Sequence, residues 1–211
     1  MSDFEGIAKA VLGGDEDAVA ELVEQALKEG ASAEQIVSDA LIKGMNVVGD
    51  LFKKDELYVP EVLISAKAMK RGMGLLEPLL VGGKREALGL VVLGTVKGDI
   101  HDIGKSLVKT MLEGVGFEVV DLGIDIDEET FVQKAAQVKP DIIGMSALLT
   151  TTMVNMKPTI DALREAGLRD QVKVMVGGAP VTAAFAREIG ADGTARDAVA
   201  AVDLAKSLMG L

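Results

Sequence analysis

The sequence contains no cysteine and no tryptophan, and it has one tyrosine and one histidine among 211 residues. Without cysteine it can form no disulfide, thiolate zinc site or iron–sulfur cluster, and it has no thiol nucleophile. Its formal net charge of −11 argues against a nucleic-acid-binding surface. No apolar run reaches the about 18 residues of a membrane span, and the N-terminus carries acids where a secretory signal is basic. We expect a cytoplasmic protein that binds neither nucleic acid nor a membrane.

The composition supports a large core, because hydrophobic residues make up 49% of the chain. Its length allows one large domain or two small ones. The single histidine, His101, is the most informative residue in the composition.

Residues 1–80 show helical spacing of apolar side chains and few strand signals. Ser32 with Gln35 matches a capping box at a helix start, Gly30 suits a helix stop, and Pro60 suits the first position of a helix. Four helices joined by short turns predict an antiparallel bundle. The expected helices cover residues 7–12, 15–29, 32–51 and 60–80.

The chain changes character after a glycine-containing polar break at 81–87, which we interpret as a linker. From residue 88 to 211, apolar runs alternate with helical patterns, which predicts a doubly wound parallel sheet, an α/β fold. Ligands of such sheets bind beyond the carboxyl ends of the strands. The expected strands are 88–96, 117–122, 141–148, 172–177 and 191–194. The expected helices are 103–114, 128–138, 153–167, 181–189 and 198–209.

The loop after the first of these strands could bind three classes of ligand. A nucleotide phosphate is disfavoured, because Gly98 and Gly104 are separated by five residues whereas a P-loop has four between its glycines. Asp99 and Asp102 would also repel phosphates. The dinucleotide fingerprint G-x-G-x-x-G is absent.

A metal held by side chains alone is also disfavoured, because zinc usually needs three or four protein ligands and this chain has one histidine. A metal inside a tetrapyrrole-like macrocycle needs only one axial imidazole from the protein. Asp99 could accept a hydrogen bond from the other nitrogen of His101 and fix its tautomer. Gly104 would let a bulky ligand approach the start of the helix.

Three motifs at the ends of the expected strands resemble those of cobalamin-binding proteins. The first matches the signature D-x-H-x-x-G, the second an S-x-L after the third strand, and the third a G-G pair that ends the fourth. In this chain they are Asp99-x-His101-x-x-Gly104, Ser146-Ala147-Leu148 and Gly177-Gly178. The C-terminal half thus resembles a cobalamin-binding Rossmann-like, or flavodoxin-like, domain.

The resemblance implies a role for each residue of the loop. His101 would be the lower axial ligand of cobalt, Asp99 its hydrogen-bond partner, and Thr152 an extension of that relay. Gly98, Ile100 and Asp102 would contact the corrin and its nucleotide tail. The slot for the tail would be lined by Ser146, Leu148, Thr150, Gly177 and Gly178.

Residues 45–62 resemble the cap bundle of cobalamin-dependent methionine synthase and of the corrinoid proteins of methylamine, methanol and glycine betaine methyl transfer. In that family an aromatic and an aliphatic residue cover the upper face of the corrin. Phe52 and Val59 occupy the matching positions and would exclude water and oxygen, although both could instead be ordinary core residues.

The resemblance implies a corrinoid protein that is not catalytic alone. It would carry a methyl group on cobalt, in a methylcobalamin or related corrinoid form, from a substrate-specific methyltransferase to a second methyltransferase acting on tetrahydrofolate or coenzyme M. A reductive activator would be a further partner, and the linker would be a hinge.

Three alternatives remain open. The first is the cobalamin-binding subunit of an adenosylcobalamin mutase, although that class needs a barrel partner and lacks this type of cap. The second is a cobalamin-dependent sensor or regulator, although this chain has no DNA-binding module. The third is a flavodoxin-like module that binds no corrinoid.

Overall fold

The computed structural model describes residues 2–80 and 87–211, so the predicted linker lies, apart from Ala87, outside the described residues. The chain divides into two compact units, Met1–Glu86 with Gly114–Gly116, and Ala87–Glu113 with Phe117–Leu211. No helix in the described part of the chain is both long and apolar enough to cross a membrane.

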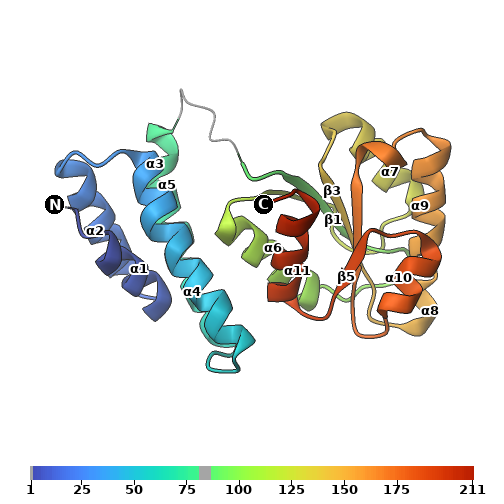
Figure 1. Ribbon diagram of the computed structural model, residues 1–211, viewed down its shortest axis with the longest axis horizontal. Helices are drawn as coiled ribbons and strands as arrows, with labels where there is room; N and C mark the ends of the chain where they lie inside the picture. The colour runs from blue at the N-terminus through green and yellow to red at the C-terminus, as the bar shows by residue number, and fades with distance from the viewer. Residues whose placement is uncertain (1, 81–86) are drawn as a thin grey trace. The chain divides into compact units, whose positions relative to one another are not determined.

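The N-terminal unit consists of helices (Figure 1). Its elements within residues 2–80 are α1 (Phe4–Gly13), α2 (Glu16–Lys28), α3 (Ala33–Ile36), a π-helical turn (Val37–Leu41), α4 (Ile42–Lys53), α5 (Val59–Leu76) and a 3-10 turn (Glu77–Leu79). Because α3, the π-helical turn and α4 form one continuous stretch, this part of the chain makes the four helical segments that the sequence predicts. The π-helical turn was not predicted.

Local signals explain where these helices begin and end. The predicted capping box forms, since Ser32 Oγ accepts from the Gln35 amide at 3.2 Å and Gln35 Oε1 accepts from the Ser32 amide at 3.2 Å. The final helix begins at Val59, one residue before Pro60, and it ends at Leu76 rather than near residue 80. The helices pack through fully buried apolar side chains, including Ile7, Val23, Leu41, Met45 and Leu76.

The C-terminal unit is a five-stranded parallel sheet in the order β2-β1-β3-β4-β5. Its strands are β1 (Leu90–Thr95), β2 (Glu118–Asp121), β3 (Ile142–Ser146), β4 (Lys173–Gly177) and β5 (Gly193–Ala195). Its helices are α6 (Ile103–Val115), α7 (Glu128–Val138), α8 (Thr150–Met153), α9 (Met156–Glu165), α10 (Ala183–Ile189) and α11 (Ala198–Leu208). This is the flavodoxin-like order, and the predicted α/β fold class is confirmed.

One predicted helix differs from the structure. In place of the single helix expected over 153–167, the chain forms a short helix α8 that ends at Met153, a break at residues 154–155, and then α9 from Met156 to Glu165. The break places Thr150 and Thr152 on the short helix α8, immediately beyond the carboxyl end of β3.

Helices cover both faces of the sheet, with α6 and α11 on one face and α7, α9 and α10 on the other (Figure 1). Phe131 of α7 and Ile160 of α9 are fully buried in one core cluster with Val92, Ile143 and Val174 of the strands. Gly193 faces the other layer, because a Cβ there would lie 2.7 Å from Leu204 of α11.

Small side chains form a row across the carboxyl edge of the sheet, on the face toward α6 and α11. Residues two positions apart along a strand share a face, so this row lies on the same face as Gly193. The row members are aligned in register across four strands, and they are Thr95, Ser146, Gly177 and Ala195. The row leaves room at this edge that larger side chains would fill.

Candidate corrinoid site

The loop between β1 and α6 presents His101 at the carboxyl edge of the sheet. Its Nδ1 lies 2.7 Å from Oδ1 of Asp99, and the same oxygen accepts from the His101 amide at 3.0 Å. Asp99 is fully buried, whereas the side chain of His101 is 45% exposed. Because Nδ1 donates to Asp99, Nε2 carries the lone pair that can bind a metal.

The other carboxylate oxygen of Asp99 is held by the segment after β3. Thr152 Oγ1 donates to Oδ2 at 2.6 Å, and the Leu148 amide donates to it at 2.8 Å. Burial alone raises the pKa of Asp99, but the hydrogen bonds from Thr152, the two amides and the His101 ring outweigh it. They hold the pKa of this carboxyl well below its usual value. Asp99 is therefore an anion that orients His101, and the predicted relay through Thr152 is present as hydrogen bonds.

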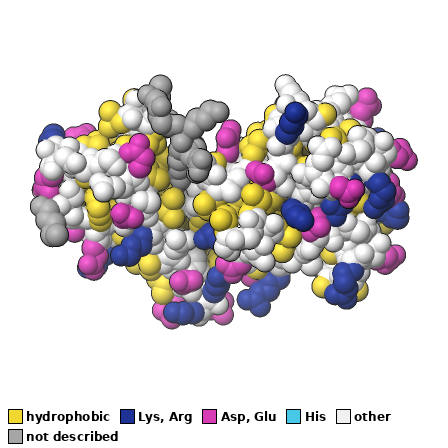
Figure 2. All heavy atoms as spheres, turned by 45° about the horizontal axis from the view of Figure 1, so that its top comes forward, with side chains coloured by type: hydrophobic (Ala, Val, Ile, Leu, Met, Phe, Trp, Pro, Cys, Tyr) yellow, Lys and Arg dark blue, Asp and Glu magenta, His cyan; other side chains and the backbone are white. Residues whose placement is uncertain are grey.

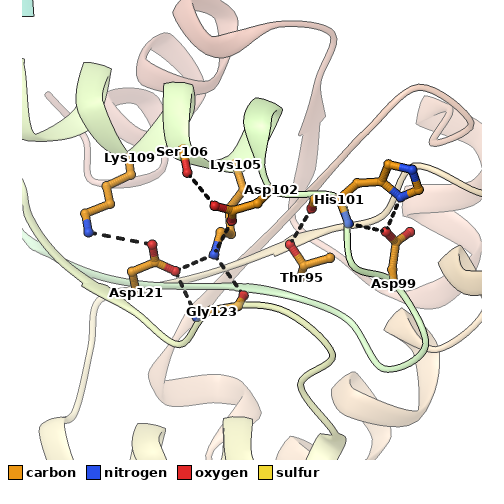
Figure 3. Close-up of polar contacts among 9 residues, drawn as sticks. All are labelled: Thr95, Asp99, His101, Asp102, Lys105, Ser106, Lys109, Asp121 and Gly123. Atoms are coloured by element: carbon orange, nitrogen blue, oxygen red, sulfur yellow. Dashed lines mark hydrogen bonds and ion pairs between the residues drawn. The ribbon is translucent and has the colours of Figure 1, made fainter.

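Further contacts fix the backbone on either side of His101 (Figure 3). Thr95 Oγ1 donates to the carbonyl of His101 at 3.0 Å. Asp102 accepts from Ser106 Oγ at 2.9 Å and pairs with Lys105 Nζ at 2.8 Å. The hydrogen bond from Lys105, followed by that from Ser106, lowers the pKa of Asp102.

Lys105 is the centre of a buried cluster. Its side chain is 2% exposed, and besides Asp102 its Nζ contacts Asp121 Oδ1 at 2.5 Å and the Gly123 carbonyl at 2.8 Å. Burial raises the pKa of Asp121, but Lys105 and the Gly123 amide lower it further than burial raises it. Three acceptors satisfy the three donors of the ammonium group, which explains why this cation can be buried.

The predicted slot residues lie at the same edge of the sheet. Ser146 and Gly177 are in the row of small side chains. Gly178 has a φ of +124°, and a Cβ there would clash with the backbone carbonyl of Ala147, so this position requires glycine. Leu148 and Thr150 are exposed after the end of β3.

The remaining predicted residues of the loop are exposed. Gly98 adopts a φ of +79°. Ile100 is 71% exposed and Ile103, at the start of α6, is 86% exposed. A Cβ at Gly104 would meet nothing within 4 Å. Asp102 is exposed and tied to α6, as described above.

Phe52 and Val59 lie in the N-terminal unit, and the loop residues lie in the C-terminal unit. Phe52 is half-buried in α4, and Val59 is exposed at the start of α5. Apolar neighbours of Val59 are exposed as well: Tyr58, Leu63 and Ile64.

Sequence reasoning missed three polar residues of this region, namely Lys105, Asp121 and Asp125. A lysine in the first turn of an expected helix, with an aspartate at the end of the next strand, is the signal that could have indicated the pair of Lys105 and Asp121.

The donor set fits a metal that brings most of its own ligands. Within the described residues, no group of three or more His, Cys, Asp or Glu side chains is arranged to hold a metal ion. One imidazole with a fixed tautomer faces outward instead, beside exposed isoleucines and a row of small residues. A planar macrocycle with an attached tail matches these features, because it needs one axial ligand, an apolar surface and a narrow slot.

Comparison with known proteins agrees with this chemistry. Two models, each described as a B12 binding domain, match residues 89–203 and 3–77. The chain is 47% identical over 213 residues to a corrinoid protein of Desulfitobacterium hafniense, covering 100% of this chain and 99% of the relative. It is 47% identical over 213 residues to dimethylamine corrinoid protein 3 of Methanosarcina acetivorans, covering 99% of this chain and 100% of the relative.

Solved structures give the same result. A cobalamin-binding protein from D. hafniense matches with a TM-score of 0.83 at 34% identity, over 99% of both chains. A chain of the methanol:cobalamin methyltransferase complex of Methanosarcina barkeri matches with a TM-score of 0.89 at 33% identity, over 98% of this chain and 79% of that one.

The fold and the site therefore define a cobalamin-binding protein with a helical cap and a Rossmann-like domain. The chain belongs to the B12-binding family of corrinoid proteins found in methyltransferase systems. Its cofactor is cobalamin or a related corrinoid, whose metal is cobalt.

Proposed function

We propose that this chain carries a methyl group on the cobalt of its corrinoid, from a substrate-specific methyltransferase to a second methyltransferase acting on tetrahydrofolate or coenzyme M. When bound, the corrinoid supplies a metal centre that takes up and releases the methyl group, and this chemistry belongs to the cofactor. The chain itself is not catalytic. The observation that carries the proposal is His101, held by buried Asp99 with one ring nitrogen directed outward.

Within this proposal, the residues of the loop control the axial position of the metal. Asp99 fixes the tautomer of His101, so that Nε2 is the ring nitrogen left to bind the metal. Thr152 and the Leu148 amide keep Asp99 in place. Gly98, Ile100, Asp102 and Gly104 would border the macrocycle. Its nucleotide tail would be held by Ser146, Leu148, Thr150, Gly177 and Gly178.

We propose further that residues 1–80 form a cap and residues 88–211 the corrinoid-binding domain, with 81–87 as the linker between them. Phe52 and Val59 would shield the upper face of the macrocycle from water and oxygen. The exposure of Val59 and its apolar neighbours supports this role, because exposed apolar side chains that lie next to one another, unlike single ones, mark surfaces that bind a ligand or a partner.

The names of the relatives favour methylated amines as the donor. Relatives that are 46–50% identical are called dimethylamine and trimethylamine corrinoid proteins, whereas the match to the methanol complex is 33% identical. A reductive activator would restore the cofactor after adventitious oxidation.

The proposal is tested by incubating the corrinoid-loaded chain, reduced and without oxygen, with extract of the source cells and labelled trimethylamine, dimethylamine, monomethylamine or methanol. We expect label to be retained on the loaded chain and not on the corrinoid-free chain, and then to pass to tetrahydrofolate or coenzyme M. If the loaded chain takes no label from any donor, the carrier role is wrong. Isomerisation of a carbon skeleton with adenosylcobalamin would instead support the mutase alternative.

A further inference from the structure

The loop after β2, residues 122–127, is joined to the loop that carries His101 by a series of hydrogen bonds. The Thr95 amide donates to the Gly123 carbonyl at 3.0 Å, and the Ile126 amide donates to the Thr95 carbonyl at 2.9 Å. Val96 and Ile126 form an isolated parallel bridge. The parallel pairing between β1 and β2 thus continues past the end of β2, as far as Ile126.

Asp125 makes two contacts with the backbone of the two-residue segment Gly98-Asp99. Its Oδ1 accepts from the Gly98 amide at 2.7 Å, and its own amide donates to the Asp99 carbonyl at 3.0 Å. A charge-assisted bond of this length is among the stronger hydrogen bonds in proteins. Asp125 therefore holds the backbone before Gly98 and after Asp99, two residues that lie three and two positions before His101.

The backbone of Asp125 is in a conformation that few residues adopt. Its φ is +56°, in the left-handed region that Asp and Asn tolerate better than most non-glycine residues. That conformation directs its amide toward Asp99 and its carboxylate toward Gly98. Such outliers persist where the surrounding structure requires them, and they concentrate at functional sites.

The opposite end of the same loop is anchored to α6. Gly123 accepts at its carbonyl from Lys105 Nζ, and its amide donates to Asp121 Oδ1 at 3.0 Å. Figure 3 shows Lys105 between Asp121, Asp102 and the Gly123 carbonyl, on the side of the loop away from Asp99. The loop after β2 is thus fixed at Gly123, so Asp125 acts from a rigid support.

We propose that Asp125 is a positioning residue for the axial histidine: it holds the Gly98 amide and the Asp99 carbonyl and so sets the direction in which His101 presents Nε2. This inference rests on the proposed ligand role of His101. Asp99 orients the ring directly, but the position of Asp99 depends on the backbone of the loop, and Asp125 fixes that backbone. A small displacement of a metal ligand weakens its bond, and loss of an outer partner costs about 10–100-fold in metal affinity.

Three variants separate the effect of the Asp125 carboxylate from the effect of its backbone conformation. Asp125→Gly keeps the left-handed conformation and removes the acceptor, Asp125→Ala disturbs both, and Asp125→Asn keeps an acceptor and tolerates the conformation. Asp127→Ala is the matched control, because Asp127 caps α7 through the Thr130 amide at 2.9 Å and belongs to the same loop.

The first readout is the nitrogen splitting in the cobalt(II) electron paramagnetic resonance spectrum of each chain loaded with cobalamin. We expect Asp125→Gly and Asp125→Ala to lose most of the histidine-coordinated fraction, and Asp125→Asn and Asp127→Ala to keep it. If Asp125→Gly keeps the wild-type spectrum, the carboxylate does not position His101 and the proposal is overturned.

The second readout uses the corrinoid-free chain. Hydrogen exchange of a peptide covering Gly98 should speed up about tenfold in Asp125→Gly, which corresponds to the loss of one hydrogen bond to a charged acceptor, and it should stay unchanged in Asp127→Ala. Unchanged exchange in Asp125→Gly would show that the Asp125 carboxylate does not hold the Gly98 amide, and the proposal would be overturned. If the wild-type chain shows no nitrogen splitting, the ligand role of His101 fails. The exchange result still decides whether Asp125 holds the Gly98 amide.

Discussion

Individual residues of the site divide into those that a motif predicts and those that the fold brings in. His101, Asp99 and Gly104 lie within six residues of one another, so their spacing is visible in the sequence. Thr152 is 53 residues from Asp99, and it was predicted only because of the family resemblance. Asp125 is 27 residues from Gly98, and it was missed because the contact depends on the pairing of β1 with the segment after β2.

Replacement of Thr152 by valine should expose the energetic importance of the buried relay. The valine has a similar shape but no hydroxyl, so Oδ2 of Asp99 loses a donor that lies at 2.6 Å. We expect the free energy of unfolding of the corrinoid-free chain to fall by about 1.5–3 kcal/mol, measured by urea denaturation at pH 7. Thr152→Ser restores the hydroxyl and should recover most of it. Equal stability of the valine and wild-type chains would show that the bond contributes little.

Asp121 should make the stability of the chain depend on pH. Its folded-state pKa is lowered, most strongly among the lowering interactions by Lys105. Its stabilisation is therefore fully present above the unfolded pKa of about 4 and is lost as the pH falls toward the lower folded value. Asp121→Asn should destabilise the chain by about 2 kcal/mol at pH 7, and the difference from wild type should shrink below pH 4.

Asp161→Asn is the control for Asp121. It alters an exposed ion-paired carboxylate on α9 and should leave the stability at pH 7 close to that of wild type. A difference between Asp121→Asn and wild type that stays constant down to pH 2 would contradict the assigned linkage.

At the scale of elements, periodicity and caps located the helices and strands of the described chain to within a few residues. The exceptions have local causes. The π-helical turn at Val37–Leu41 lies inside one apolar stripe, so the hydrophobic pattern does not reveal it. Residues 150–165 form two helices, α8 and α9, and Thr152 of α8 donates to Asp99, a contact that the hydrophobic pattern does not reveal.

Two glycines that follow strands β1 and β4 should behave differently on substitution by alanine. Gly104→Ala places a methyl group in open space near the start of a helix, so the corrinoid-free chain should be as stable as wild type or slightly more stable. Its affinity for hydroxocobalamin should nevertheless fall, because the methyl group occupies space that the macrocycle needs.

Gly178→Ala should instead destabilise the chain itself. The new Cβ clashes with the Ala147 carbonyl at a residue with a φ of +124°, and we expect a loss of at least about 2 kcal/mol. Unfolding and equilibrium binding measured on both variants separate the two effects. Wild-type affinity in a folded Gly104→Ala chain would contradict the placement of the ligand beside this glycine.

For the whole molecule, the family and the cofactor followed from three short motifs in the α/β half together with the resemblance of residues 45–62 in the helical half. The face in Figure 2 shows acidic and basic side chains interspersed rather than a basic patch, as the net charge of −11 suggested. The sequence does not fix the methyl donor, because a carrier presents the same cobalt to each partner enzyme and the donor is recognised by the partner.

Corrinoid binding should stabilise the complete chain through linkage to folding. A ligand that binds only the folded state at a hundredfold excess over its Kd adds about 2.7 kcal/mol to the free energy of unfolding. Denaturation with and without hydroxocobalamin should show this gain in the wild type and a smaller gain in His101→Ala at the same concentration. An equal gain in both chains would mean that His101 contributes nothing to affinity.

The most direct test of the account is the cobalt(II) electron paramagnetic resonance spectrum of the cobalamin-loaded chain, recorded with natural-abundance and with 15N-labelled histidine. The chain has one histidine, so the label reports on one residue. We predict that the nitrogen splitting changes from a three-line to a two-line pattern on labelling and disappears in His101→Ala. A splitting that does not change on labelling, or that persists in His101→Ala, would contradict the assignment of His101 as the axial ligand.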